Sequence, residues 1–259
     1  MKKKRILITT GDVDGVGPEV TYKALAQIHK DEDFQYIVFR SKFDDKFCLS
    51  KISNGHSYVE VKSLQEAINK NEDIVVVTSE HPPAKWVEIA AESCLNEVCD
   101  ALVTGPLSKT EIVNSGYNQI GHTEILKKVS GAKAVYMTFL GSKFNVLLLT
   151  GHIPVKMIPS YINKVNLEES IKTAQVVVNL LCTEQKNRPI GFIGLNPHAG
   201  EHGLIGSEEM QIIKPTIEHM KYNGVNIEGP LVPDAAFLPN TWDKYSIFIS
   251  PYHDQGLTA

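Results

Sequence analysis

Residues 5–30 read RILITTGDVDGVGPEVTYKALAQIHK, and this stretch decides the class of fold. A short apolar run, RILITT, leads into a glycine-rich turn and then into a longer segment with apolar residues at helical spacing. Pro18 stands at the start of that segment, a position that proline favours in helices. The stretch therefore predicts a strand, a tight turn and a helix, which is the repeating unit of a parallel sheet.

The same alternation continues through nearly all of the 259 residues. Short β-branched runs predict further strands at residues 34–39, 57–61, 73–78, 100–105, 134–140, 144–150, 189–195, 225–230 and 245–250. Helical patterns lie at 83–99, 108–116, 122–131, 166–185 and 207–224. Ser108 with Glu111, and Asn166 with Glu169, fit capping boxes at helix starts. Only residues 141–143 separate two of the strands, which predicts an antiparallel hairpin in an otherwise parallel sheet.

Composition limits the function classes. The chain is 42% hydrophobic and 22% charged, with a formal net charge of −4. It has no basic stripe for nucleic acid and no run of ~18 apolar residues for a bilayer. The opening MKKKR precedes an apolar run that ends at Thr9, so it reads as a tail before a strand and not as a signal peptide. Four cysteines without a CxxC pair predict free thiols, and we expect a cytoplasmic protein that binds neither nucleic acid nor membrane.

Histidines follow three of the predicted strands, where ligands bind in parallel α/β sheets. His152 follows the strand at 144–150, His198 follows 189–195, and His253 follows 245–250. Three neutral imidazoles from three loops suit a divalent transition metal and leave positions open for a substrate. The alternative is that each histidine only hydrogen-bonds its own loop. Their shared position favours the metal site.

The spacing of His198 and His202 does not make a zinc motif by itself. Such a motif needs one helical face, and Pro197 and Gly200 interrupt any helix here. His202 is the weaker candidate because it lies further past the strand. Four other histidines are expected to be solvated: His29, His56, His81 and His219.

Two glycine-containing segments could bind an anion. Residues 11–17, GDVDGVG, lack the dinucleotide-binding spacing, so a tight strand-to-helix turn is the alternative. His122 and Thr123 open the helix at 122–131, where Thr123 is a candidate N-cap and free backbone amides favour an anionic group. A plain helix start is the alternative there.

Six segments together resemble the 4-hydroxythreonine-4-phosphate dehydrogenase family of pyridoxal phosphate biosynthesis. They are TTGDVDGVGPEV, ALVTGPLSK, GHTEIL, TGHIPV, GLNPHAGEHGLIGSEE and YHDQGL, and they span residues 9–257. The resemblance implies two α/β/α domains with mainly parallel, partly mixed sheets and an interdomain cleft, as in isocitrate and isopropylmalate dehydrogenases. We expect the first domain at 1–120 and the second, which carries the metal histidines, at 121–259.

The resemblance also implies an activity. Family members use NAD or NADP to oxidise 4-phosphooxy-L-threonine to 2-amino-3-oxo-4-phosphooxybutanoate, which loses carbon dioxide to give 3-amino-2-oxopropyl phosphate. Histidines matching His152, His198 and His253 bind one divalent metal, for which zinc, cobalt, magnesium and manganese remain open.

The same resemblance assigns roles to further residues. The pair matching His122 and Thr123 contacts substrate. Asp254, beside His253, is the expected catalytic or proton-relay group, with a loop cap as the alternative. A homodimer is implied, with each active site finished by the partner subunit.

The chain departs from the family pattern in three places. Val13 and Asp14 replace a common Pro-Ala pair, and His202 stands where glycine is usual. The sequence ends at Ala259, whereas relatives continue into a tail that completes the first domain and carries substrate-binding lysine, asparagine and arginine residues. Alternatives are therefore a dehydrogenase of phosphothreonate or phosphoerythronate, a metal-dependent hydrolase, and an inactive truncated metal-binding homologue.

Overall fold

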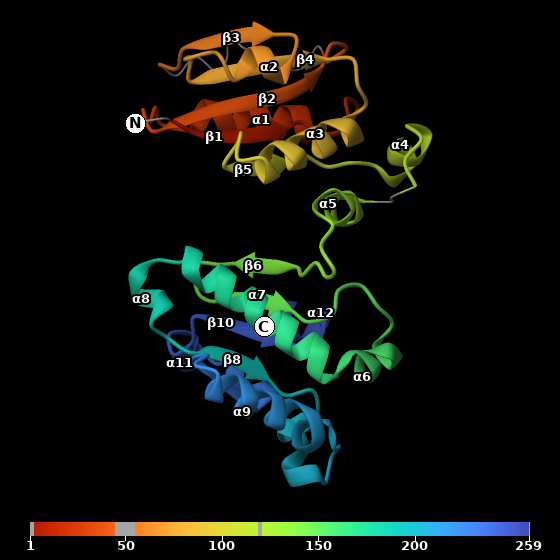
Figure 1. Ribbon diagram of the computed structural model, residues 1–259, viewed down its shortest axis with the longest axis vertical. Helices are drawn as coiled ribbons and strands as arrows, with labels where there is room; N and C mark the ends of the chain where they lie inside the picture. The colour runs from red at the N-terminus through yellow and green to blue at the C-terminus, as the bar shows by residue number, and fades with distance from the viewer. Residues whose placement is uncertain (1–2, 45–54, 119–120, 259) are drawn as a thin grey trace. The chain divides into compact units, whose positions relative to one another are not determined.

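The computed structural model describes residues 3–44, 55–118 and 121–258 (Figure 1). The chain divides into two compact units, residues 1–135 and 136–259. Each unit has its own five-stranded sheet and its own apolar clusters. The ten strands predicted from the sequence are all present.

The sheet of the first unit has the order β3–β4–β2–β1–β5, and every pair in it is parallel. Its strands are β1 (Lys4–Thr9), β2 (Phe34–Ser41), β3 (Tyr58–Val61), β4 (Ile74–Ser79) and β5 (Ala101–Thr104). Its helices are α1 (Gly17–Gln27), α2 (Leu64–Ala67), α3 (Pro83–Leu95), α4 (Lys109–Asn114) and α5 (His122–Ser130).

Helices cover both faces of this sheet. Successive side chains of a strand point to opposite faces. Leu7 of β1 accordingly packs in one buried cluster with Trp86 of α3, while Ile8 packs in another with Leu25 of α1. This arrangement confirms the predicted three-layer α/β/α form for the first unit.

The division between the units falls after Val135 and not after residue 120. Ile125 of α5 packs in a buried cluster with Val87 of α3 and Ile112 of α4. Since this apolar contact ties α5 to α3, the helix that begins at His122 belongs to the first unit.

The second sheet has the order β6–β7–β10–β8–β9. β6 is antiparallel to β7, and the other pairs are parallel, which confirms the predicted hairpin and the mixed sheet. The strands are β6 (Thr138–Leu140), β7 (Asn145–Leu148), β8 (Ile190–Ile193), β9 (Ile227–Leu231) and β10 (Ile247–Ser250).

The helices of the second unit also lie on both faces of its sheet. The α-helices are α6 (Ile158–Tyr161), α7 (Lys164–Leu180), α8 (Thr183–Lys186), α9 (Lys214–Tyr222), α10 (Pro233–Ala236), α11 (Pro239–Trp242) and α12 (His253–Leu257). Further helical turns of other types are η2 (Val155–Met157), η3 (Pro197–Gly203) and η4 (Glu209–Ile213). Leu147 packs with Ile171 of α7, whereas its neighbour Leu148 packs with Ala236 of α10.

Two local predictions were wrong. Asn166 is not the N-cap of α7, because the side chain of Asn163 accepts a hydrogen bond from the backbone N of Asn166 at 3.0 Å and the helix begins at Lys164. His56 is not solvated. It is 6% exposed, and its Nε2 lies 3.0 Å from the carbonyl oxygen of Ile28.

Other expectations about the whole chain can also be compared with the structure. Within residues 3–44, 55–118 and 121–258, no helix has the length and apolar character needed to cross a bilayer. Cys94 and Cys182 are free thiols, as predicted, and Cys48 lies outside the described residues.

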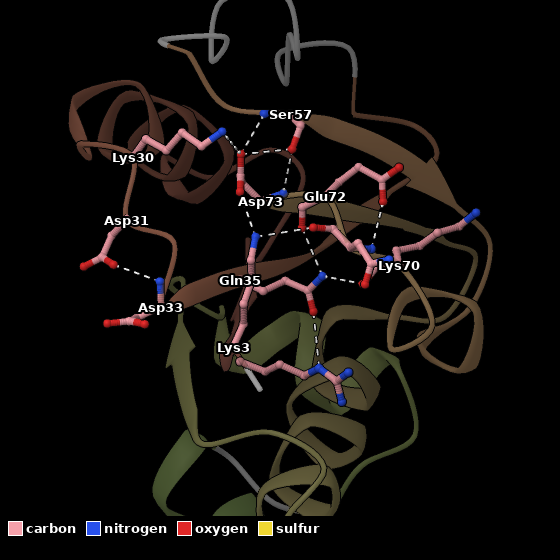
Figure 2. A network of polar contacts seen from close by, with 11 residues as sticks. Lys3, Lys30, Asp31, Asp33, Gln35, Ser57, Lys70, Glu72 and Asp73 are labelled. Carbon is pink, nitrogen blue, oxygen red and sulfur yellow. Dashed lines mark hydrogen bonds and ion pairs between the residues drawn. The ribbon is translucent and has the colours of Figure 1, made fainter. Parts of the chain in front are cut away.

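A buried carboxylate joins separate segments of the first unit (Figure 2). Asp73, with a side chain 5% exposed, accepts hydrogen bonds from Lys3 Nζ at 2.9 Å and from the backbone N and Oγ of Ser57, each at 2.9 Å. Lys30 Nζ lies 3.2 Å from the same carboxylate. Burial alone would raise the pKa of Asp73, but these contacts outweigh it and hold that pKa far below its ordinary value.

Candidate active site

Three neighbouring parallel strands of the second sheet bring candidate histidines to one edge. His152 lies in the loop after β7, His253 is the first residue of α12 after β10, and His198 lies in η3 after β8. β10 lies between β7 and β8 in the sheet. Because the carboxyl ends of parallel strands meet at the same edge, the fold places these three loops beside one another.

Hydrogen bonds join the bases of these loops. The buried Thr150 donates through Oγ1 to the carbonyl oxygen of Pro251 at 2.7 Å. Gln255 donates through Nε2 to the carbonyl oxygen of Gly194 at 2.8 Å and accepts from Ser250 Oγ at 2.7 Å. The loop after β10 is therefore attached to the chain segments that follow both of its neighbouring strands.

His152 and His253 come together at this edge. Their ring centroids are 5.0 Å apart, with 53° between the ring planes. Nδ1 of His253 lies 2.9 Å from Oδ1 of Asp254. Since a carboxylate can only accept, Nδ1 carries the hydrogen, which leaves Nε2 as the ring nitrogen that can bind a ligand. A carboxylate beside a metal-binding histidine commonly fixes the tautomer in this way.

His198 does not join that pair. Within the described ranges 3–44, 55–118 and 121–258, no group of three or more His, Cys, Asp or Glu side chains is arranged to hold a metal ion. The structure thus brings together two of the three predicted ligands. The His152–His253 pair could form one side of a divalent-metal site, and His198, the predicted third ligand, does not lie beside it.

The backbone around His198 is left-handed. Residues 198–202 have positive φ angles of 52°, 51°, 77°, 43° and 57° in order, and four of the five are not glycine. A left-handed conformation costs a residue other than glycine about 1–2 kcal/mol. The segment must therefore be held by contacts from outside it.

In the first unit, His122 and Thr123 lie at the start of α5. His122 is half-buried, and its Nε2 donates to the carbonyl oxygen of Gly105 at 3.1 Å. Burial lowers the pKa of His122 below its ordinary value, so the ring is neutral at pH 7 and Nδ1 is an acceptor. The residue before the helix is Gly121, and Thr123 lies exposed inside it, so the N-cap prediction for Thr123 was wrong.

Asp12 is a candidate functional residue that the sequence patterns did not single out. Its carboxylate accepts a hydrogen bond from the backbone N of Ser108, and its own backbone N donates to the carbonyl oxygen of Pro106 at 3.1 Å. Burial raises the pKa of Asp12, and the hydrogen bond from Ser108 acts in the opposite direction. Asp12 therefore fixes the loop after β5 beside His122. The only available signal was its place directly after β1.

The segment GDVDGVG is a tight turn. A side chain at Gly17 would collide with the carbonyl oxygen of Thr10, so the start of α1 can approach the end of β1 only with glycine there. This close packing favours the strand-to-helix turn over a phosphate cradle.

Two α/β units with mainly parallel sheets, and polar residues gathered at the carboxyl ends of their strands, define a two-domain α/β enzyme. The chain belongs to the family described as pyridoxal phosphate biosynthetic protein PdxA, whose model matches residues 26–259.

Individual relatives agree with this family. A 4-hydroxythreonine-4-phosphate dehydrogenase of Sulfurihydrogenibium sp. (strain YO3AOP1) is 32% identical over an alignment that covers 98% of this chain and 81% of the relative. A D-threonate 4-phosphate dehydrogenase of Pectobacterium atrosepticum is 27% identical over 98% of this chain and 82% of its own length. The crystal structure of 4-hydroxythreonine-4-phosphate dehydrogenase from Klebsiella pneumoniae matches with a TM-score of 0.79 and 25% identity, over 98% of this chain and 81% of that one.

Proposed function

We propose that this protein is an NAD- or NADP-dependent 4-hydroxythreonine-4-phosphate dehydrogenase. It would oxidise the secondary alcohol of 4-phosphooxy-L-threonine, and the 3-oxo acid formed would then lose carbon dioxide to give 3-amino-2-oxopropyl phosphate. The observation that carries this proposal is the family match over residues 26–259. The nicotinamide supplies the redox chemistry, and the protein supplies orientation and charge.

We propose His152, His253 and His198 as the ligands of one divalent metal. When bound, such an ion would lower the pKa of the substrate hydroxyl and stabilise negative charge on its oxygen. The 5.0 Å separation of the His152 and His253 rings and the available Nε2 of His253 support this assignment. His198 would reach the pair by movement of its loop or from a second copy of the chain in a homodimer. Imidazole ligands favour zinc or cobalt over magnesium.

Other side chains would hold the substrate and move protons. Asp254 fixes the tautomer of His253 and, being 73% exposed, can pass a proton to solvent. The neutral ring of His122 presents Nδ1 to a donor on the substrate, such as its hydroxyl or ammonium group. Thr123 lies among the first amides of α5, which suit an anionic group such as the phosphate.

A second candidate substrate is D-threonate 4-phosphate, on which the 27% identical Pectobacterium relative is named. This compound carries the same phosphate and secondary alcohol but has a hydroxyl in place of the amino group. The two substrates therefore make the same demands on the metal and the nicotinamide, and they differ only at the second carbon.

Parallel assays would test the proposal. The full chain is incubated with either substrate, NAD⁺ or NADP⁺, and zinc, cobalt, manganese or magnesium, and reduced nicotinamide and carbon dioxide are measured. We expect both products with 4-phosphooxy-L-threonine and a loss of both in His253→Ala. Reduction only with D-threonate 4-phosphate would favour the second candidate. Release of inorganic phosphate without nicotinamide would indicate a hydrolase, and no turnover under any condition would contradict both dehydrogenase assignments.

A further inference from the structure

The left-handed segment at 198–202 is held by a buried carboxylate. Glu209, at the start of η4, is 1% exposed. One of its oxygens, Oε1, accepts from the backbone N of Asn196 at 2.7 Å, and the other, Oε2, accepts from Asn196 Nδ2 at 2.8 Å. Glu209 thus binds the residue that leads into η3 at two points.

The same carboxylate also packs against the segment itself. A Cβ atom placed on Gly200 would lie 2.7 Å from Oε2 of Glu209. Gly200 has a φ of 77°, which favours glycine, and it is buried against Glu209, which leaves no room for a side chain. The carboxylate therefore touches the chain both before and within the left-handed turns, on either side of His198.

We propose that Glu209 is a positioning residue that sets the direction of His198 by holding Asn196 and the backbone at Gly200. The contacts of Glu209 with Asn196 and Gly200 are observed in the structure and do not depend on the proposed function. The consequence for metal binding rests on the proposed function, because His198 is the ligand that must be brought to the His152–His253 pair.

The orientation of the Asn196 amide gives a specific test. Glu208 Oε2 also accepts from Asn196 Nδ2, at 2.9 Å, so two carboxylates face one NH₂ group. In Glu209→Gln, the new NH₂ group would face the NH₂ group of Asn196, so two donors would meet. If the Asn196 side-chain amide turned over, its oxygen could accept from the new NH₂ group but would then lie against the carboxylate of Glu208. In the double variant Glu208→Gln/Glu209→Gln, the turned amide could accept from both new NH₂ groups. The backbone N of Ser207, which donates to the same Oε2 of Glu208 at 3.0 Å, would then lose its acceptor. The double variant should therefore recover only part of what Glu209→Gln loses.

Two measurements on the full chain test this inference. Hydrogen exchange of the metal-free protein reports on the segment around residues 196–206, and titration with Co²⁺ alone reports on the histidines. We expect Glu209→Gln to exchange faster in that segment and to bind Co²⁺ at least about 10-fold more weakly, with partial recovery in the double variant. Glu218→Gln, an exposed carboxylate on α9, is the matched control and should behave as wild type.

The outcomes separate this inference from the proposed function. Asn196→Ala, which keeps both carboxylates, should accelerate exchange in the same segment and carries the test if Glu209→Gln does not fold. Unchanged exchange in either single variant would overturn the positioning role. If the wild type binds no Co²⁺ while the exchange results hold, the positioning role stands and the proposed metal site fails.

Discussion

The chemistry of single residues in this protein depends on which group each one faces. His253 and His122 each donate a hydrogen bond through one ring nitrogen, yet they leave different atoms available. The carboxylate of Asp254 takes the Nδ1 hydrogen of His253 and leaves Nε2 as the acceptor. The carbonyl oxygen of Gly105 takes the Nε2 hydrogen of His122 and leaves Nδ1. One residue type can therefore serve a metal in one place and a substrate donor in another.

Asp254 should matter for metal binding and not for folding. In Asp254→Asn the neutral amide holds the His253 tautomer less firmly, so we expect the affinity for Co²⁺ or Zn²⁺ to fall about 10- to 100-fold. The side chain is 73% exposed, so the midpoint of thermal unfolding should stay unchanged. Calorimetric titration of the metal and thermal denaturation would measure the two effects. An unchanged metal affinity would remove Asp254 from the site.

Asp73 should matter for stability in a pH-dependent way. Its folded-state pKa is lowered, so its contribution to the free energy of unfolding is complete above the unfolded-state pKa of about 4 and is lost as the pH falls through the folded-state value. Asp73→Asn should cost about 2 kcal/mol at pH 7, a moderate loss because the lysine partners are partly exposed and screened. The cost should be smaller at pH 3, because that pH lies below the unfolded-state pKa of the carboxyl group.

Urea unfolding at both pH values would measure the effect at Asp73. Asp33→Asn, which removes an exposed carboxylate near the same network, is the matched control and should change stability little (Figure 2). A cost that stays the same at pH 3 would contradict the assigned cause.

At the scale of elements, the position of α7 depends on its first residues. Asn163 accepts from the backbone N of Asn166, whereas the side chain of Asn166 turns back to the carbonyl oxygen of Tyr161 at 3.0 Å. Leu167, one turn into the helix, is fully buried against the sheet. The cap therefore sets where the apolar face of α7 begins.

Loss of that cap should be measurable. We expect Asn163→Ala to lower the free energy of unfolding by about 1 kcal/mol, since one helix amide loses its acceptor. Asn166→Ala should cost less, because only a side-chain hydrogen bond to the carbonyl oxygen of Tyr161 is removed. Chemical denaturation of both variants would compare them, and a larger cost at Asn166 would restore the capping box predicted from the sequence.

At the scale of the whole molecule, the apolar clusters lie within one unit or the other. Trp86 is fully buried in the first unit, and Trp242 lies in the second, with its ring centroid 5.4 Å from that of Phe144. Each unit thus contains one tryptophan, since the chain has two in all. The fluorescence of each can report on its own unit.

Truncating a core side chain of the second unit should lower the stability of that unit more than the stability of the first. Ile171→Ala removes a fully buried side chain of α7, and we expect a cost of about 2–5 kcal/mol in the unfolding transition of that unit. The change is introduced into Trp86→Phe and Trp242→Phe backgrounds, so that one tryptophan reports at a time. The transition seen by Trp242 should shift more than the one seen by Trp86. Equal shifts would show that the two units unfold together.

The sequence by itself determined the class of fold and the positions of the strands along the chain. Apolar periodicity and turn residues are local signals, and every strand expected from them is present. The place of His152 and His253 after two strands also followed from the sequence, since strand direction sends both loops to one edge. The motif GSEE was visible, but it carried no indication of what Glu209 holds.

Tertiary structure alone decided the contacts between distant residues. Asp12 meets Ser108 across 96 positions, and Thr150 meets Pro251 across 101, so no local pattern could reveal either pair. The left-handed backbone at His198 is equally hidden, because a histidine disfavours that conformation and the contacts of Glu209 with Asn196 and Gly200 come from outside the segment. Sequence periodicity reports which face of an element is buried, whereas the site depends on long-range hydrogen bonds that only the folded chain can form.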